Sequence, residues 1–221
     1  GKGYAPVDER YGLQPGKVTA GLAALVGLAG VEFSFEHSQE WLQTFLLFEV
    51  SENTVRAETE TLGALALAGD LAQSQSSQNE AYLQERLRDV VAVPPRLYGS
   101  IDAAKVRIEP RKQAEKQEKN EAWRDMKVGC WYETEEVSPK RCSTRERAKQ
   151  ERDAVIYRAK NIRYYCDIAE ASEFGKLMWG QGCREQADWA RELIFVCDGA
   201  TWIWKLVEQY YPQAVQIVDW Y

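Results

Sequence analysis

The chain has 221 residues, of which 45% are hydrophobic and 11% aromatic, so it can build a hydrophobic core and is not disordered by composition. Its single histidine, His37, argues against a histidine-rich zinc site and against a Ser-His-Asp triad. Five cysteines without CxxC spacing are typical of reduced thiols rather than of a disulfide framework.

The net charge of −6 is unevenly distributed along the chain. Residues 1–102 carry a net charge of −7, residues 103–165 carry +6, and residues 166–221 carry −5. A contact with a polyanion is therefore expected in the middle third. A solvated insertion of mixed charge explains the same distribution equally well.

No signal peptide is present, and the longest apolar stretch, residues 21–30, is too short to span a bilayer. We therefore expect a cytoplasmic protein without a membrane partner. The sequence begins without Met and ends in an apolar, strand-like run at residues 214–221, as expected for a piece of a longer protein.

The N-terminal third is predicted to be helical after an irregular segment at residues 1–16. Helices are expected at 19–28, 35–47 and 52–62, with Ser51 as the N-cap of the last. A helix, a short turn and a helix opened by Ser are typical of a helix-turn-helix, so Ser51, Thr54 and Arg56 are candidate DNA contacts. The glutamates of residues 52–60 suit phosphates poorly, and a plain three-helix unit is at least as probable an interpretation.

A domain boundary is predicted at Pro94-Pro95. The preceding residues 64–91 have a helical pattern with a polar break at 73–78. This divides the chain into a helical, helix-turn-helix-like region, 1–93, and a second domain, 94–221.

The second domain has the pattern of a mixed α+β or α/β protein. Strands are predicted at 97–101 (continued beyond a bend at 104–108), 123–132, 162–168, 192–197 and 214–218, with helices at 172–190 and 201–210. Three hairpin-linked strands followed by alternating helices and strands form the order of a ribonuclease H-like mixed sheet. In that order the first and fourth strands are adjacent and parallel.

An aspartate closes each of these two strands. Asp102 follows Leu-Tyr-Gly-Ser-Ile, and Asp198 follows Leu-Ile-Phe-Val-Cys. A carboxylate beside a core must be paired, hydrogen-bonded or bound to a metal. Two on neighbouring strands would provide oxygen ligands for Mg²⁺ or Mn²⁺. Alternatively, Asp102 caps a turn and Asp198-Gly199 is a turn dipeptide.

Four motifs resemble the core of DDE transposases from bacterial insertion sequences. They are Tyr98-Gly-Ser-Ile-Asp102-Ala, Trp123-Arg-Asp-Met-Lys-Val-Gly129, Phe195-Val-Cys-Asp198-Gly-Ala-Thr-Trp-Ile-Trp204 and Ile217-Val-Asp219-Trp-Tyr221. Residues 1–13 and 50–55 resemble the N-terminal parts of the same proteins, in which a Cys-rich zinc module usually lies upstream.

The resemblance implies two-metal cleavage and joining of DNA at insertion-sequence ends, by a nucleoid-associated protein that is a homo-oligomer when active. It makes Asp102 and Asp198 catalytic metal ligands and leaves the third acid, normally Glu, without a counterpart, with Asp219 as a supporting acid. The basic residues expected to contact DNA, for which a solvated loop is an equal alternative, are Lys105, Arg107, Arg111, Lys112, Lys140, Arg141, Arg145 and Arg147.

Two other hypotheses stay open. The chain could be a non-catalytic DNA-binding or assembly fragment of a transposase, in which the fold remains without the chemistry. It could also be another ribonuclease H-like nuclease that acts on a different nucleic acid. Trp202 and Trp204 are expected to hold their helix against the sheet rather than to stack on bases.

Overall fold

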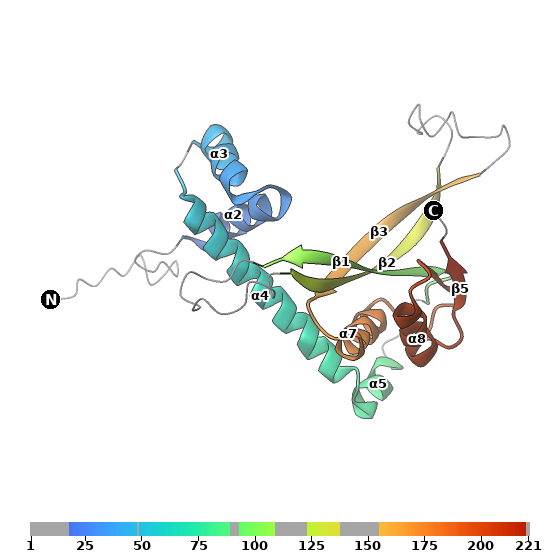
Figure 1. Ribbon diagram of the computed structural model, residues 1–221. Coiled ribbons are helices and arrows are strands. Elements are labelled where there is room, and N and C mark those ends of the chain that lie inside the picture. The colour runs from blue at the N-terminus through green and yellow to red at the C-terminus, as the bar shows by residue number, and fades with distance from the viewer. Residues whose placement is uncertain (1–17, 48, 89–92, 109–122, 138–154, 220–221) are drawn as a thin grey trace. The chain divides into compact units, whose positions relative to one another are not determined.

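The computed structural model describes residues 18–47, 49–88, 93–108, 123–137 and 155–219. By its contacts the chain divides into two compact units, residues 1–69 and 70–221. The described residues form six helices and a five-stranded mixed sheet, an α+β arrangement compatible with a ribonuclease H-like fold (Figure 1). Among them, no helix is both long and apolar enough to cross a membrane.

The first unit consists of α2 (Ala20–Glu32), α3 (Phe35–Leu46) and the first part of α4 (Glu52–Ser76). Thr19 and Ser34 cap α2 and α3 by accepting hydrogen bonds from backbone N–H groups three residues on. Its small core contains Val26, Leu42 and Val55. Gly27 and Gly30 let α2 approach α4 closely, because a Cβ at either position would lie within 2.2 Å of Leu62 or Thr59.

The helix predicted at 52–62 is longer than expected. α4 runs without interruption from Glu52 to Ser76, so the polar break predicted at 73–78 is wrong for most of its length. The side chain of Ser74 is buried in the second unit, which explains a polar residue in a continuous helix, and Ser77, in the turn after α4, is buried as well. A helix-turn-helix is not confirmed for this unit, and the domain limits 1–93 and 94–221 stay predictions.

The sheet of the second unit has the strand order β3-β2-β1-β4-β5. Its strands are β1 (Leu97–Arg107), β2 (Trp123–Val137), β3 (Ile156–Asp167), β4 (Leu193–Cys197) and β5 (Val215–Val218). The β1–β2 and β2–β3 pairs are antiparallel, whereas β1–β4 and β4–β5 are parallel. The predicted adjacency of the first and fourth strands is therefore confirmed.

The helices α7 (Ala171–Arg184) and α8 (Thr201–Tyr210) build the core against one face of the sheet. Trp131 meets Phe195 and Tyr211 edge-on in this core, at ring-centre distances of 5.4 Å. The short helix α5 (Glu80–Arg86) and the end of α4 lie beside α7 (Figure 1). The bounds of α8 match the prediction, whereas α7 begins one residue earlier and ends six residues earlier than predicted.

Candidate functional site

The parallel contact between β1 and β4 positions the two predicted metal ligands. Leu97, Tyr98 and Gly99 pair with Leu193, Ile194 and Phe195. Two side-chain contacts continue this register: Ser100 Oγ donates to the Val196 carbonyl at 2.8 Å, and the Ile101 N–H donates to Cys197 Sγ at 3.3 Å. Extended three positions beyond the last backbone pair, Gly99 with Phe195, the same register brings Asp102 level with Asp198.

The alternation of the strands assigns both aspartates to one face. Ile101 and Cys197 are buried in the core beneath α7 and α8, whereas Asp102 and Asp198 are exposed. Neighbouring residues in one register of a parallel sheet share a face, and adjacent strands lie about 4.8 Å apart. Asp102 and Asp198 therefore belong to one row on the face opposite the helices.

Asp219, the residue after β5, continues the same row. Cys197 pairs with Val218, and the Asp219 N–H donates to the Cys197 carbonyl at 2.8 Å. The next position in this register pairs Asp198 with Asp219, which is also exposed. Three aspartates thus occupy corresponding positions of three neighbouring strands.

The position of Asp102 within its strand differs from the prediction. β1 does not end at Asp102 but continues to Arg107, because residues 102–107 pair with residues 123–128 of β2. The bend predicted between 102 and 104 is wrong. Asp102 lies where β1 no longer has β4 beside it, and not where β1 ends. Asp198 does follow the last residue of β4, as predicted.

Cys197 and Ser100 are site residues that sequence reasoning missed. The pKa of the Cys197 thiol is raised to about 12, mainly by burial, and the negative charges of Asp198 and Asp102 contribute to this rise. This electrostatic effect reflects the proximity of both carboxylates to one sulfur atom. The signal in the sequence was a small polar residue just before each acid, in Ser-Ile-Asp and Cys-Asp.

Each of the two aspartates uses one carboxylate oxygen to accept a hydrogen bond from a nearby backbone N–H. Asp102 Oδ1 accepts a hydrogen bond from the Ala103 N–H at 2.6 Å, and Asp198 Oδ1 accepts one from the Ala200 N–H at 2.9 Å. Among the described residues, neither Oδ2 atom accepts a hydrogen bond. Two exposed carboxylates on adjacent strands are a donor set that fits a hard divalent cation such as Mg²⁺ or Mn²⁺.

Within the ranges that the structure describes, no group of three or more His, Cys, Asp or Glu side chains is close enough together to hold a metal ion. The three aspartates therefore correspond in backbone position without forming a three-carboxylate cluster. The pair Asp102 and Asp198 is the donor set that fits a cation.

The tryptophans that follow Asp198 hold α8 in place. Trp204 Nε1 donates to the Asp198 carbonyl at 2.9 Å, and the Trp202 ring meets Phe174 of α7 edge-on. Lys127 Nζ lies 5.6 Å from the centre of the Trp202 ring. These contacts agree with the packing role expected for both tryptophans.

The predicted DNA contacts of the first unit have structural partners. Ser51 Oγ accepts a hydrogen bond from the Thr54 N–H at 3.1 Å and contacts Thr54 Oγ1 at 2.8 Å, which caps α4. Arg56 forms an ion pair with Glu52 at 3.5 Å and lies 5.4 Å above the Phe35 ring. DNA binding by these residues stays a prediction.

The predicted basic contacts of the second unit are described only in part. Lys105 forms an ion pair with Asp125 at 2.8 Å, which lowers the pKa of Asp125 through their hydrogen bond and charge. Arg107 is exposed at the end of β1. The remaining predicted contacts, Arg111, Lys112, Lys140, Arg141, Arg145 and Arg147, lie outside the described residues.

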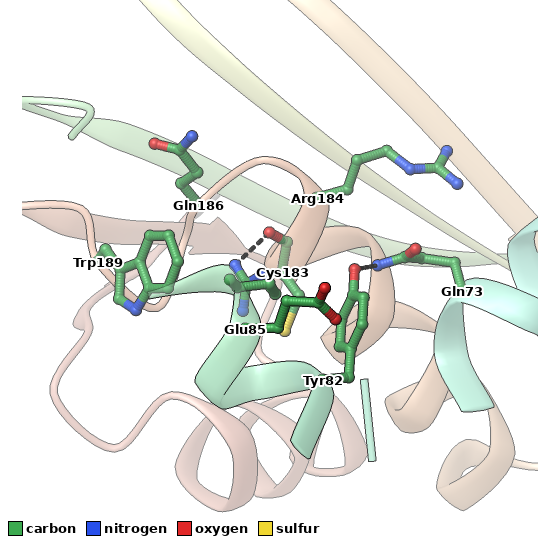
Figure 2. A pocket seen from close by; sticks show the side chains of 8 residues that line it. Gln73, Tyr82, Glu85, Cys183, Arg184, Gln186 and Trp189 are labelled. Atoms are coloured by element: carbon green, nitrogen blue, oxygen red, sulfur yellow. Dashed lines mark hydrogen bonds between the residues drawn. The ribbon is translucent and has the colours of Figure 1, made fainter. Parts of the chain in front are cut away.

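A cavity of about 390 Å³ lies elsewhere in the second unit, between α5 and the ends of α4 and α7. Two hydrogen bonds join residues that line it: Gln73 Nε2 donates to Tyr82 Oη at 2.9 Å, and Arg86 donates to the Cys183 carbonyl (Figure 2). None of the predicted metal or DNA contacts lines it. We therefore assign this cavity no part in the site.

A scan against known protein families finds no match, and a search of curated proteins finds none. Among solved structures, a pre-cleavage Mos1 transpososome is similar over 88% of this chain, with 11% identical residues and a TM-score of 0.21. The match spans 58% of that chain. A TM-score of this size does not establish a shared fold, so the comparison with a ribonuclease H-like fold depends on the strand order of the sheet and on its aspartates.

Proposed function

We propose that Asp102 and Asp198 bind Mg²⁺ or Mn²⁺ in a ribonuclease H-like core that acts on DNA ends in the manner of an insertion-sequence transposase. The single observation that carries this proposal is the register of β1, β4 and β5, which, extended beyond the paired residues, brings Asp102, Asp198 and Asp219 level with one another. That the substrate is DNA and that the active protein is a homo-oligomer are inferred from the four sequence motifs that resemble DDE transposases.

The chemistry follows from the carboxylates. A bound divalent cation would neutralise negative charge on a phosphodiester and orient the attacking oxygen. Asp102 and Asp198 would hold it, and Asp219 would add negative charge at the edge of the site. Because the third acid of the transposase triad has no counterpart here, we expect cation binding without complete transposition by this chain.

Binding of Mn²⁺ tests the site directly, because free Mn²⁺ has an electron paramagnetic resonance signal that decreases on binding. We expect Asp102→Asn and Asp198→Asn each to weaken Mn²⁺ binding about tenfold or more, the range seen when metal-site carboxylates are disturbed. Asp125→Asn is the matched control, since it removes an exposed carboxylate from the same sheet. Equal Mn²⁺ binding by all three variants would refute the metal site.

A non-catalytic DNA-binding fragment is the second candidate. The observation in its favour is that no three potential ligands cluster among the described residues. It predicts salt-dependent DNA binding that Asp102→Asn and Asp198→Asn leave unchanged, together with no Mn²⁺-dependent nicking of supercoiled plasmid. Nicking that both substitutions abolish supports the catalytic proposal. Preferential cleavage of an RNA–DNA hybrid would instead indicate another ribonuclease H-like nuclease.

A further inference from the structure

Helix α2 is apolar around its whole circumference. No charged residue occurs from Val18 to Val31. A helix of this kind is normally buried on all sides. In the first unit only Val26, Gly27 and Ala29 of α2 are buried, while Leu28 is 62% and Val31 76% exposed. The described residues of this unit therefore leave a second apolar side of α2 uncovered.

A run of exposed aromatic rings connects the end of α2 to α3. Phe33 follows α2, and its ring centre lies 6.1 Å from that of Trp41, which in turn lies 5.1 Å from that of Phe45. The exposed fractions of Phe33, Trp41 and Phe45 are 45%, 41% and 65%. We call this surface, made of Leu28, Val31, Phe33, Trp41 and Phe45, the apolar ridge.

Acidic side chains accompany the apolar ridge. Glu32, Glu36 and Glu40 are exposed on the same two helices, and none of them forms an ion pair with a described residue. From residue 18 to residue 69 the chain has seven glutamates, one arginine and no lysine. The electrostatic potential of this unit is therefore negative, which repels phosphate groups and favours cationic partners.

We infer that the apolar ridge binds an amphipathic helix of a partner protein whose apolar side is flanked by Lys and Arg. The partner helix would present apolar residues at i, i+3, i+4 and i+7 to the apolar ridge, and its basic flanks would meet Glu32, Glu36 and Glu40. The same charges disfavour nucleic acid and anionic lipid. They also disfavour a second copy, since its ridge would bring like charges together.

Isothermal titration calorimetry on the full chain tests this inference. The probe is a synthetic helical peptide of Leu and Lys with Leu at helical spacing, and the control peptide has Glu in place of Lys. We expect only the Lys peptide to bind. Glu40→Lys should weaken that binding about fivefold, the equivalent of losing one favourable charge pair. Phe45→Ser should weaken it further, and Glu208→Lys, an exposed charge reversal in the second unit, should not.

Three results would overturn the inference. The first is absence of binding, or equal binding of both peptides, by wild-type chain whose circular dichroism shows it to be folded. The second is binding that neither Glu40→Lys nor Phe45→Ser alters. The third is self-association in analytical ultracentrifugation that Phe45→Ser abolishes, because the ridge would then be the interface between two copies.

Discussion

The guanidinium of Arg86 donates a hydrogen bond to each carboxylate oxygen of Asp188, at 3.0 and 3.1 Å. Its plane lies over Trp189, 4.3 Å from the ring centre. The two charged side chains are only 11% and 16% exposed. Burial lowers the pKa of Arg86, but the hydrogen bond and charge of Asp188 raise it on balance, so the guanidinium stays charged. This contact fixes α5 to the segment after α7.

Arg86→Ala should lower the free energy of unfolding by about 3–5 kcal/mol, because it leaves the Asp188 carboxylate buried without its partner. Urea denaturation followed by circular dichroism measures this change. The matched control is Arg96→Ala, which breaks the exposed ion pair with Glu192 and should leave stability unchanged within error. Equal effects of the two substitutions would contradict the structural role of the Arg86–Asp188 pair.

Gly180 is predicted to be intolerant of any side chain. A Cβ there would lie 2.6 Å from the Ser74 Cα, so the backbones of α4 and α7 would have to separate. Gly180→Ala should therefore destabilise the protein by about 1–3 kcal/mol. Gly69→Ala, where no atom lies within 4 Å, should stabilise α4 by about 0.5–1 kcal/mol. Thermal melting of both variants gives opposite shifts if this packing is right.

The buried thiols should make the fold sensitive to alkaline pH. Burial is the main cause that raises the pKa of Cys183 to about 11 and that of Cys197 to about 12. An unfolded thiol ionises near pH 8.5. The free energy of unfolding is therefore unaffected by these thiols below that pH. It falls as the pH rises toward the folded-state pKa, by about 1.4 kcal/mol per pH unit for each thiol.

Urea denaturation between pH 8 and pH 10.5 measures this loss. Cys183→Ala should have a shallower decline than the wild-type chain, because one of the buried titrating thiols is gone. An identical pH dependence of the two proteins would show that other groups, such as the buried hydroxyls of Tyr165 and Tyr211, cause the decline.

Asp198 combines a structural and a proposed functional role that substitutions can separate. Asp198→Ala removes the acceptor for the Ala200 N–H and should lower stability by about 0.5–1.5 kcal/mol. Asp198→Asn keeps an oxygen acceptor and should retain near-native stability. If Asn also preserves Mn²⁺ binding, Asp198 has only the structural role.

The strand order could be predicted from the sequence, because the apolar runs are short and each is bounded by turn or charged residues. The same pattern gave the adjacency of β1 and β4 and the place of Asp198. The continuation of β1 past Asp102 could not be predicted, since residues 103–107 are mostly polar or small and gain their pairing from β2. Hydrogen bonds to a distant strand determine that length, and local sequence does not contain them.

The full length of α4 could not be predicted for a similar reason. Ser74 and Ser77 resemble a polar break when only neighbouring residues are considered. Their partners are distant: Ser74 lies against Gly180, and the Ser77 carbonyl accepts a hydrogen bond from Trp179 Nε1 at 2.9 Å. The direct ligation of a cation by Asp102 and Asp198 remains a prediction from the residues and their register.

The two edges of the sheet bear on solubility. β3 is a 12-residue edge strand, and an edge of that length presents unpaired backbone groups to other chains. It carries Arg158, Lys160 and Arg163, and cations on an edge oppose pairing with a strand of the same kind. β5, at the other edge, has only four residues. Substituting the three cations with Thr would leave the core intact and favour edge-to-edge aggregation.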